Sequence, residues 1–122
     1  MKYLCLAYEE EEKLNGLSQS EWHDLRGETI AYVEELRKSG HLVLTHALQS
    51  ARKAATVRVR KGAAAVMDGP FAETKEQLGG FFLIEARDLD EATALAARWP
   101  SARIGSIEVR PIEEKLRTES RY

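Results

Sequence analysis

The segment Asp68-Gly69-Pro70-Phe71-Ala72-Glu73-Thr74-Lys75-Glu76-Gln77-Leu78-Gly79-Gly80-Phe81 joins a turn, a cluster of charges and the start of an apolar strand. Asp68 can accept a hydrogen bond from a backbone N–H two residues further on, which is how aspartate commonly starts a turn. Pro70 fixes its own φ and favours an extended conformation at Gly69. The segment therefore predicts a rigid turn that places several charged side chains beside the end of a strand.

Two interpretations of this turn follow from its side chains. In the functional one, Asp68 acts as an acid or base, Lys75 holds an anionic group and Phe71 forms the wall of a pocket. In the structural one, Asp68 only fixes the turn, Phe71 fills the core and the charged residues are solvated, as charges near turns commonly are. The candidate ligand-binding residues are Asp68, Gly69, Pro70, Phe71 and Lys75.

Hydrophobic periodicity on either side of the segment predicts the strands. They are expected at 3–8, 42–48, 81–86 and 106–110, with a hairpin formed by 56–60 and 63–67. Residues 9–16 have the composition of a charged loop. Gly79 and Gly80 could permit close approach of a ligand, although such glycines more often mark a bulge or the beginning of a strand.

Two helices are expected between these strands. Ser18 and Glu21 have the spacing of a capping box, and Gly40 stands where the first helix would stop. The second helix starts at Asp88 or Asp90 and ends at Pro100. The faces expected to be buried are Trp22, Leu25, Thr29, Tyr32, Val33 and Leu36 in the first helix, and Leu89, Ala92, Leu95, Ala96 and Trp99 in the second.

The order of elements predicts a single domain, 1–112, followed by a charged tail, 113–122. Without the inserted hairpin the order is βαββαβ, the ferredoxin-like α+β pattern with both helices on one face of the sheet. The strands 3–8 and 81–86 are apolar on both sides, so the other face would expose more apolar surface than monomers normally do. Since symmetric dimers are the commonest oligomers, we expect a homodimer packed sheet to sheet.

Composition and charge argue against several classes of protein. The 122 residues are 43% apolar and 31% charged, and the formal net charge of −2 offers no general attraction for nucleic acid or anionic lipid. Cys5, the single cysteine, lies between leucines like a small buried hydrophobe and permits no intramolecular disulfide. Without an apolar run of membrane-spanning length or a signal-peptide pattern, a cytoplasmic protein with no membrane contact is expected.

The three histidines are further candidates for the site. His46, in the strand 42–48, could transfer protons near neutral pH, and it joins Asp68 as a catalytic candidate. His23 and Asp24 are adjacent on the first helix and cannot pair directly, and His41 is expected at the surface. No two histidines have the spacing of a metal site on one helical face, and no phosphate-loop or dinucleotide fingerprint is present, so no metal and no cofactor are expected.

A family resemblance is carried by Asp68–Phe71 with Glu73-Thr74-Lys75-Glu76, continued by Phe81-Phe82-Leu83-Ile84-Glu85-Ala86-Arg87-Asp88-Leu89-Asp90-Glu91-Ala92. This run resembles the motif of the DGPF branch of the YCII-related family, and the likeness extends over nearly the whole chain. It implies a dimeric α/β barrel. Because members of this branch also occur fused to sigma-factor-like domains, it also implies a role beside transcription initiation.

The same resemblance bears on catalysis. Members of the broader family carry a histidine in the first helix and a later aspartate, a pair that suggested an enzyme. Here the expected helix position is Thr29, and Arg98-Trp99-Pro100-Ser101 holds no aspartate after the second helix. The enzymatic inference therefore transfers poorly to this chain.

Three hypotheses about function follow. The first is a domain that binds or senses a small polar metabolite in a cleft between helix, sheet and the turn at 68–75. The second is a cofactor-free enzyme of the lyase or dehydrochlorinase type, with Asp68 or His46 transferring a proton. The third is a module that docks a sigma factor or another regulator. A basic patch around the hairpin could also meet an acidic partner or a phosphate: Arg52, Lys53, Arg58, Arg60 and Lys61.

Overall fold

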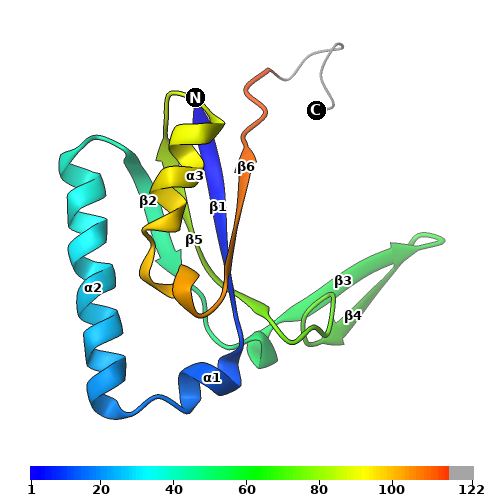
Figure 1. The fold of residues 1–122 in the computed structure, drawn as a ribbon. Helices are drawn as coiled ribbons and strands as arrows, with labels where there is room; N and C mark the ends of the chain where they lie inside the picture. Colours follow the sequence, from blue (N-terminus) through cyan, green and yellow to red (C-terminus); the bar gives the residue numbers. More distant parts are fainter. Residues whose placement is uncertain (116–122) are drawn as a thin grey trace.

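The computed structural model describes residues 1–115, which form a four-stranded antiparallel sheet, helices on one of its faces and a separate two-stranded hairpin (Figure 1). The elements in chain order are β1 (Lys2–Glu9), α1 (Glu11–Asn15), α2 (Gln19–Lys38), β2 (Leu42–Ala47), a 3-10 turn (Ala51–Lys53), β3 (Ala55–Arg60), β4 (Ala63–Asp68), β5 (Gln77–Glu85), α3 (Leu89–Ala97), a second 3-10 turn (Pro100–Arg103) and β6 (Ser106–Pro111). Within this described part, no helix is long and apolar enough to cross a membrane. Of the tail expected at 113–122, residues 113–115 have no regular structure and the rest lies outside the described residues.

The sheet has the strand order β2-β5-β1-β6, and each neighbouring pair is antiparallel. This mixed α+β arrangement is compatible with the predicted ferredoxin-like pattern. The predicted hairpin is confirmed as β3 and β4, which pair with each other rather than with the larger sheet.

The two predicted helices, α2 and α3, begin where the sequence predicts. The capping box is confirmed, because Ser18 Oγ accepts from the Glu21 N–H at 3.1 Å and the Ser18 N–H donates to Glu21 Oε1 at 2.9 Å. Of the two candidate caps of α3, Asp88 is the one that accepts from a backbone N–H, that of Glu91. Gly40 follows α2 with a φ of +81°, a conformation that glycine adopts without strain.

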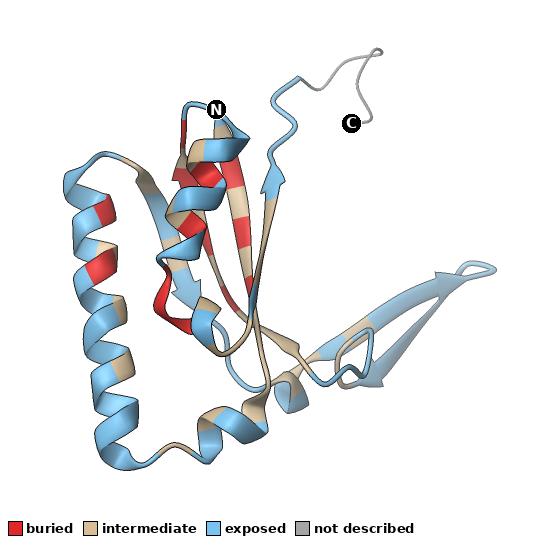
Figure 2. Cartoon of the chain, viewed as in Figure 1, coloured by how far each residue is buried: buried red, intermediate tan, exposed pale blue. Residues whose placement is uncertain are grey.

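Side chains from β1, β5, α2 and α3 form the core between the sheet and the helices (Figure 2). Phe82 is fully buried and stacks on Trp99 with ring centroids 4.0 Å apart. Cys5 is also fully buried, as expected of a small hydrophobe, and burial raises the pKa of its thiol to about 12. The fully buried large side chains are Tyr3, Cys5, Leu36, Phe82 and Ile84.

The opposite face of the sheet is apolar and half-exposed, and no helix of residues 1–115 covers it. Strand register places its side chains opposite one another in pairs such as Leu6 with Phe81. Full burial of one such side chain stabilises a protein by roughly 1.5–3 kcal/mol. We call this surface the open face; it consists of Leu4, Leu6, Tyr8, Leu44, Leu78, Phe81 and Leu83.

Two boundaries differ from the expectations. The segment 9–16 is not all loop, because Glu11–Asn15 forms the short helix α1. The strand expected at 81–86 begins at Gln77, because a bulge opposite Ala7 and Tyr8 absorbs Gly79 and lets pairing continue. The prediction that the Gly-Gly pair marks a bulge is thereby confirmed.

Candidate functional site

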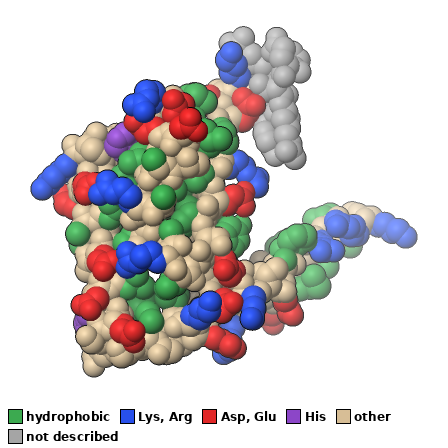
Figure 3. Space-filling view, in the orientation of Figure 1, with side chains coloured by type: hydrophobic (Ala, Val, Ile, Leu, Met, Phe, Trp, Pro, Cys, Tyr) green, Lys and Arg blue, Asp and Glu red, His purple; other side chains and the backbone are tan. Residues whose placement is uncertain are grey.

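A cleft of about 840 Å³ lies between α2 and the sheet, at the end where β1 finishes and β5 begins. Apolar side chains gather in this part of the surface, with charged groups around them (Figure 3). We call it the helix–sheet cleft. Much of its wall is apolar, with contributions from Leu14, Trp22, Leu25, Ile30 and Val33.

The cleft exists because α2 packs on the core only through its C-terminal half. There Leu36 and Tyr32 are buried, and the Tyr32 hydroxyl donates to the Leu95 carbonyl at 2.6 Å. Towards the N-terminus, Leu25 is half-buried and Trp22 is 44% exposed. The prediction that the whole apolar stripe of this helix is buried is therefore wrong for its first half, which faces the cleft instead.

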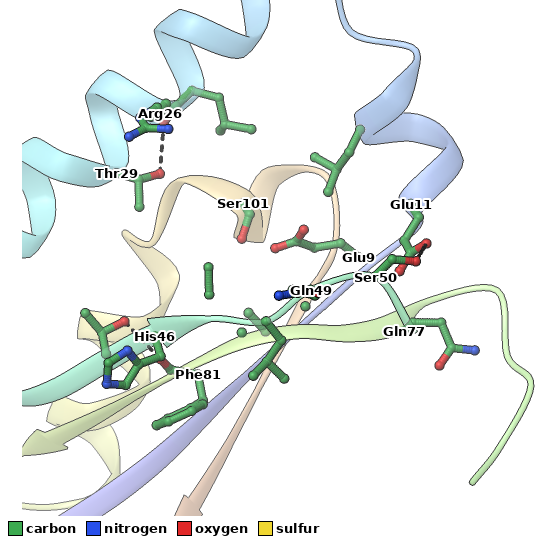
Figure 4. A pocket seen from close by; sticks show the side chains of 18 of the residues that line it. Glu9, Glu11, Arg26, Thr29, His46, Gln49, Ser50, Gln77, Phe81 and Ser101 are labelled. Carbon is green, nitrogen blue, oxygen red and sulfur yellow. Dashed lines mark hydrogen bonds between the residues drawn. The ribbon is translucent and has the colours of Figure 1, made fainter. Parts of the chain in front are cut away.

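Glu9, the last residue of β1, projects its carboxylate into the helix–sheet cleft (Figure 4). Burial raises the pKa of this carboxyl above its usual range, and the Ser101 hydroxyl lowers it again in part by favouring the charged form. The carboxylate lies against Gly79, where an added Cβ would come 3.2 Å from Glu9 Oε2. Gly79 therefore provides the space in which the Glu9 side chain lies.

Ser101, in the 3-10 turn after α3, is 6% exposed, and its Oγ has no hydrogen-bond partner within residues 1–115. Its hydroxyl and the Glu9 carboxylate point toward each other (Figure 4). They are close enough to affect the pKa of Glu9, although no hydrogen bond of normal geometry joins them. Native proteins rarely leave a buried hydroxyl unpaired, so this pair is suited to a ligand group that completes the bond.

Thr29 also lines the cleft, at the position where the resemblance implied a histidine. Its hydroxyl donates to the Leu25 carbonyl one turn earlier in α2, at 2.8 Å. Ser101 comes from the segment in which the resemblance implied an aspartate. The fold thus brings both positions to one cleft, where this chain has two hydroxyls and, beside them, the carboxylate of Glu9.

A second cleft, of about 650 Å³, lies at the base of the hairpin and contains part of the 68–75 turn. Pro70, Phe71 and Thr74 of the turn line it together with Tyr8 and Leu78 of the sheet. The cleft expected between helix, sheet and this turn is therefore divided in two. The helix–sheet cleft contains none of the five candidate residues of the turn.

Asp68 borders neither cleft, and its exposed carboxylate accepts no hydrogen bond from residues 1–115. The predicted Asp68 turn is thus wrong in its mechanism. The turn is held by the Gly69 N–H, which donates to the Ala54 carbonyl at 2.7 Å, and by the Thr56 hydroxyl, which donates to the Gly69 carbonyl at 2.9 Å. Gly69 has a φ of +99°, which explains why a glycine stands there.

Phe71 and Lys75 are at the surface of the chain. Phe71 is 76% exposed, so it does not fill the core, and its ring lies 5.4 Å from the Arg58 guanidinium carbon. Lys75 forms a long ion pair of 4.0 Å with Glu10 while its side chain is 90% exposed. An exposed pair of this kind contributes little to stability.

The structure does not bring His46 and Asp68 together at a cleft. His46 borders the helix–sheet cleft, but its ring lies on the other side of the sheet, 5.9 Å from the Phe81 ring (Figure 4). His23 is exposed. The expectation that His41 is exposed is wrong, because it is half-buried with Nδ1 2.8 Å from the Glu85 carbonyl.

Sequence reasoning missed Glu9 and Ser101. Glu9 belongs to a run of four glutamates, where any one member resembles a solvated charge. A signal was nevertheless available. Glu9 directly follows the predicted strand 3–8, and if the strand continues by one residue, the Glu9 side chain lies on the same face as Cys5 and Ala7. Ser101 carried no comparable signal.

Comparison with known proteins complements this geometry. The model of the YCII-related domain family matches residues 1–115. An uncharacterised protein of Rhizobium meliloti (strain 1021) is 40% identical over 114 residues, which are 92% of each chain. Among solved structures, 5-chloro-2-hydroxyhydroquinone dehydrochlorinase (TftG) from Burkholderia phenoliruptrix AC1100, in complex with 2,5-dihydroxybenzoquinone, has a TM-score of 0.58. Its identity is 16%, with 94% of this chain and 96% of that chain covered, so this likeness concerns the fold.

Proposed function

Because this chain belongs to the YCII-related domain family, we propose that it binds a small molecule in the helix–sheet cleft. The observation that carries the proposal is the buried, unpartnered Ser101 hydroxyl directed at the partly buried Glu9 carboxylate. A buried polar pair costs free energy unless its hydrogen bonds are completed. A bound ligand that completes them would offset this cost.

The lining indicates the chemistry of the ligand. An apolar or aromatic body fits the side chains of Trp22 and Leu25, and a hydroxyl on that body can donate to Glu9 and accept from Ser101. Arg26, Arg52 and Lys53 also line the cleft and favour a ligand with some negative charge. A hydroxylated ring compound combines these properties.

We infer further that the protein is a homodimer in which two ferredoxin-like sheets form an α/β barrel. The support is the open face, seven large apolar side chains without a covering helix in the described part of the chain. Sheet-to-sheet packing of a second copy would bury them. The role beside a sigma factor or another regulator, and the cytoplasmic location, stay predictions from the sequence.

Titration calorimetry with 2,5-dihydroxybenzoquinone, the compound bound in the structural neighbour, tests the proposed site. We expect binding to the wild type, and Glu9→Gln and Ser101→Ala each to weaken it by about tenfold or more, since the first replaces a charged acceptor by a neutral one and the second removes a hydroxyl donor. Asp68→Ala is the matched control. It removes a polar group outside the cleft and is expected to leave the affinity unchanged.

Two results would contradict this proposal. Loss of affinity in Asp68→Ala but not in Glu9→Gln would move the site to the 68–75 turn. Absence of heat with the wild type at ligand concentrations up to about 1 mM would exclude the hydroxylated-ring class at any useful affinity.

A second candidate function is proton-transfer catalysis at the same cleft. The raised pKa of Glu9 favours it, because a carboxylate that binds its proton more tightly is a better general base near neutral pH. The dehydrochlorinase fold of the structural neighbour is further support. In such a reaction Glu9 would take a proton from the substrate, and chloride would leave with the electron pair of its bond to carbon.

The proton-transfer role is thereby assigned to Glu9 rather than to Asp68 or His46. Chloride release from 5-chloro-2-hydroxyhydroquinone, the substrate in the neighbour's name, is the assay. Activity that is abolished by Glu9→Gln and retained by Asp68→Ala and His46→Ala would support the enzyme. Binding without chloride release would leave the protein a ligand-binding domain.

A further inference from the structure

The hairpin formed by β3 and β4, which we call the arm, extends away from the body of the domain (Figure 1). In this view α3 lies in front of the sheet, and the outer part of the arm is drawn fainter because it is more distant, so the arm extends away from the side that α3 covers (Figure 2). A two-stranded hairpin without further packing is at best marginally stable in water. The arm therefore has the properties of an element that packs on something else.

The arm has one apolar and one basic face. Its register places Val57 opposite Val66 and Val59 opposite Ala64, so these side chains share one face. Val57 is 62% exposed and Val66 is 66% exposed. An apolar patch exposed on an extended arm is typical of an interaction surface.

The base of the arm adjoins the open face. Tyr8 and Leu78 belong to the open face and also line the second cleft, together with Pro70 and Phe71 at the base of the arm. Phe71 lies beside Arg58, which is on the basic face of the arm. A partner that covers the open face therefore also reaches the base of the arm.

The charge of the arm indicates what this partner is. The arm has a net charge of +2, from Arg58, Arg60 and Lys61 less Asp68. Because the whole chain has a net charge of −2, the rest of the chain has a net charge of −4. Basic side chains are visible toward its outer end (Figure 3). A second copy of this chain offers both an apolar face and an acidic body, which complements the arm.

We propose that the arm of one protomer reaches across and packs its apolar face on a second copy of this chain. This inference rests on the homodimer proposed above. It adds that each protomer contributes the arm, and not only the sheet, to the interface. The arm is then a specific extension of the interface beyond the sheet-to-sheet contact.

Paramagnetic relaxation between protomers tests the contact directly. A spin label on Ala63→Cys, at the outer end of the arm, is introduced into unlabelled protein and mixed with ¹⁵N-labelled wild type. Cys5 is fully buried and is expected to take no label. We expect amide signals of the partner's sheet to lose more than about half of their intensity, while signals of its α2 stay unchanged.

Sedimentation of the double variant Val57→Ser/Val66→Ser provides an independent measurement. We expect its dimer to dissociate about tenfold more readily than the wild type, because two apolar contacts are lost. The matched control is Leu89→Ser, which changes a side chain that is 47% exposed on the helix side of the sheet, and is expected to leave the dimer unchanged.

The outcomes separate the two inferences. A stable dimer without intermolecular broadening, or one unaffected by the double variant, would overturn the arm contact while the sheet-packed dimer stands. A monomeric wild type at the NMR concentration would overturn both. Broadening together with the weakened dimer of the double variant would support the arm contact.

Discussion

Replacing Ser101 by alanine is expected to stabilise the protein. The Ser101 hydroxyl is buried, with no hydrogen-bond partner among the described residues. Its desolvation in the folded state is therefore not compensated, whereas water satisfies it in the unfolded chain. Alanine keeps the Cβ and removes only the oxygen, so the packing of the 3-10 turn is preserved.

The magnitude follows from two opposing effects. Leaving a buried hydroxyl unsatisfied costs roughly 1–3 kcal/mol. Against this, the variant loses the favourable influence of the hydroxyl on the Glu9 carboxylate, and a small void replaces the oxygen. We expect a net gain of about 1 kcal/mol, which corresponds to a rise in Tm of roughly 4 °C for a domain of this size.

Urea unfolding at one fixed protein concentration is the assay, because association makes apparent stability depend on concentration. Ser18→Ala is the matched control. It removes the same oxygen where Ser18 caps α2 and accepts from the Glu21 N–H, so a loss of about 1 kcal/mol is expected. The two serines are thus predicted to give changes of opposite sign.

A Ser101→Ala variant that is less stable than wild type by about 0.5 kcal/mol or more, at unchanged m, would refute the reasoning. It would mean that the hydroxyl is satisfied in the folded protein without a ligand. The central observation behind the proposed site would then be lost.

Other predictions concern different parts of the molecule. Glu9→Gln should stabilise the protein at pH 7 and not at about pH 3.5. Because the pKa of Glu9 is raised in the folded state, the free energy of unfolding of the wild type falls as the pH rises from the unfolded-state pKa to the folded-state pKa. Urea unfolding at both pH values measures this difference. Leu6→Asp should yield a folded monomer in sedimentation, whereas a dimer would contradict packing through the open face. Phe82→Ala should cost about 3–5 kcal/mol in urea unfolding, because it removes the ring stacked on Trp99. Gly69→Ala should cost about 1–2 kcal/mol through its positive φ, and a neutral result would mean that the turn adjusts.

Much of the fold could be predicted because it depends on local patterns. Short apolar runs identified β1 and β5, and the capping box at Ser18 and Glu21 placed the start of α2. These signals lie within a few residues of one another. The short helix α1 escaped prediction because a helix of five residues shows little periodicity.

The site was harder to predict because it depends on contacts between distant segments. Glu9 and Ser101 come from the first strand and from the turn after the last helix, and no local pattern indicates that they meet. Phe71 shows the converse difficulty. The structural interpretation made it a core residue, but it is 76% exposed and lines the second cleft, and this exposure depends on how the arm leaves the sheet.

The alternation along β1 also determines where this protein can change in length during evolution. Odd-numbered residues such as Cys5 face the helices, and even-numbered ones such as Leu6 face away. Inserting one residue early in β1 would exchange the two sets, so that the core and the open face would be lost together. The tip of the arm at Lys61 and Gly62 has no such constraint. We expect insertions and deletions among homologues to gather there and to be absent from β1.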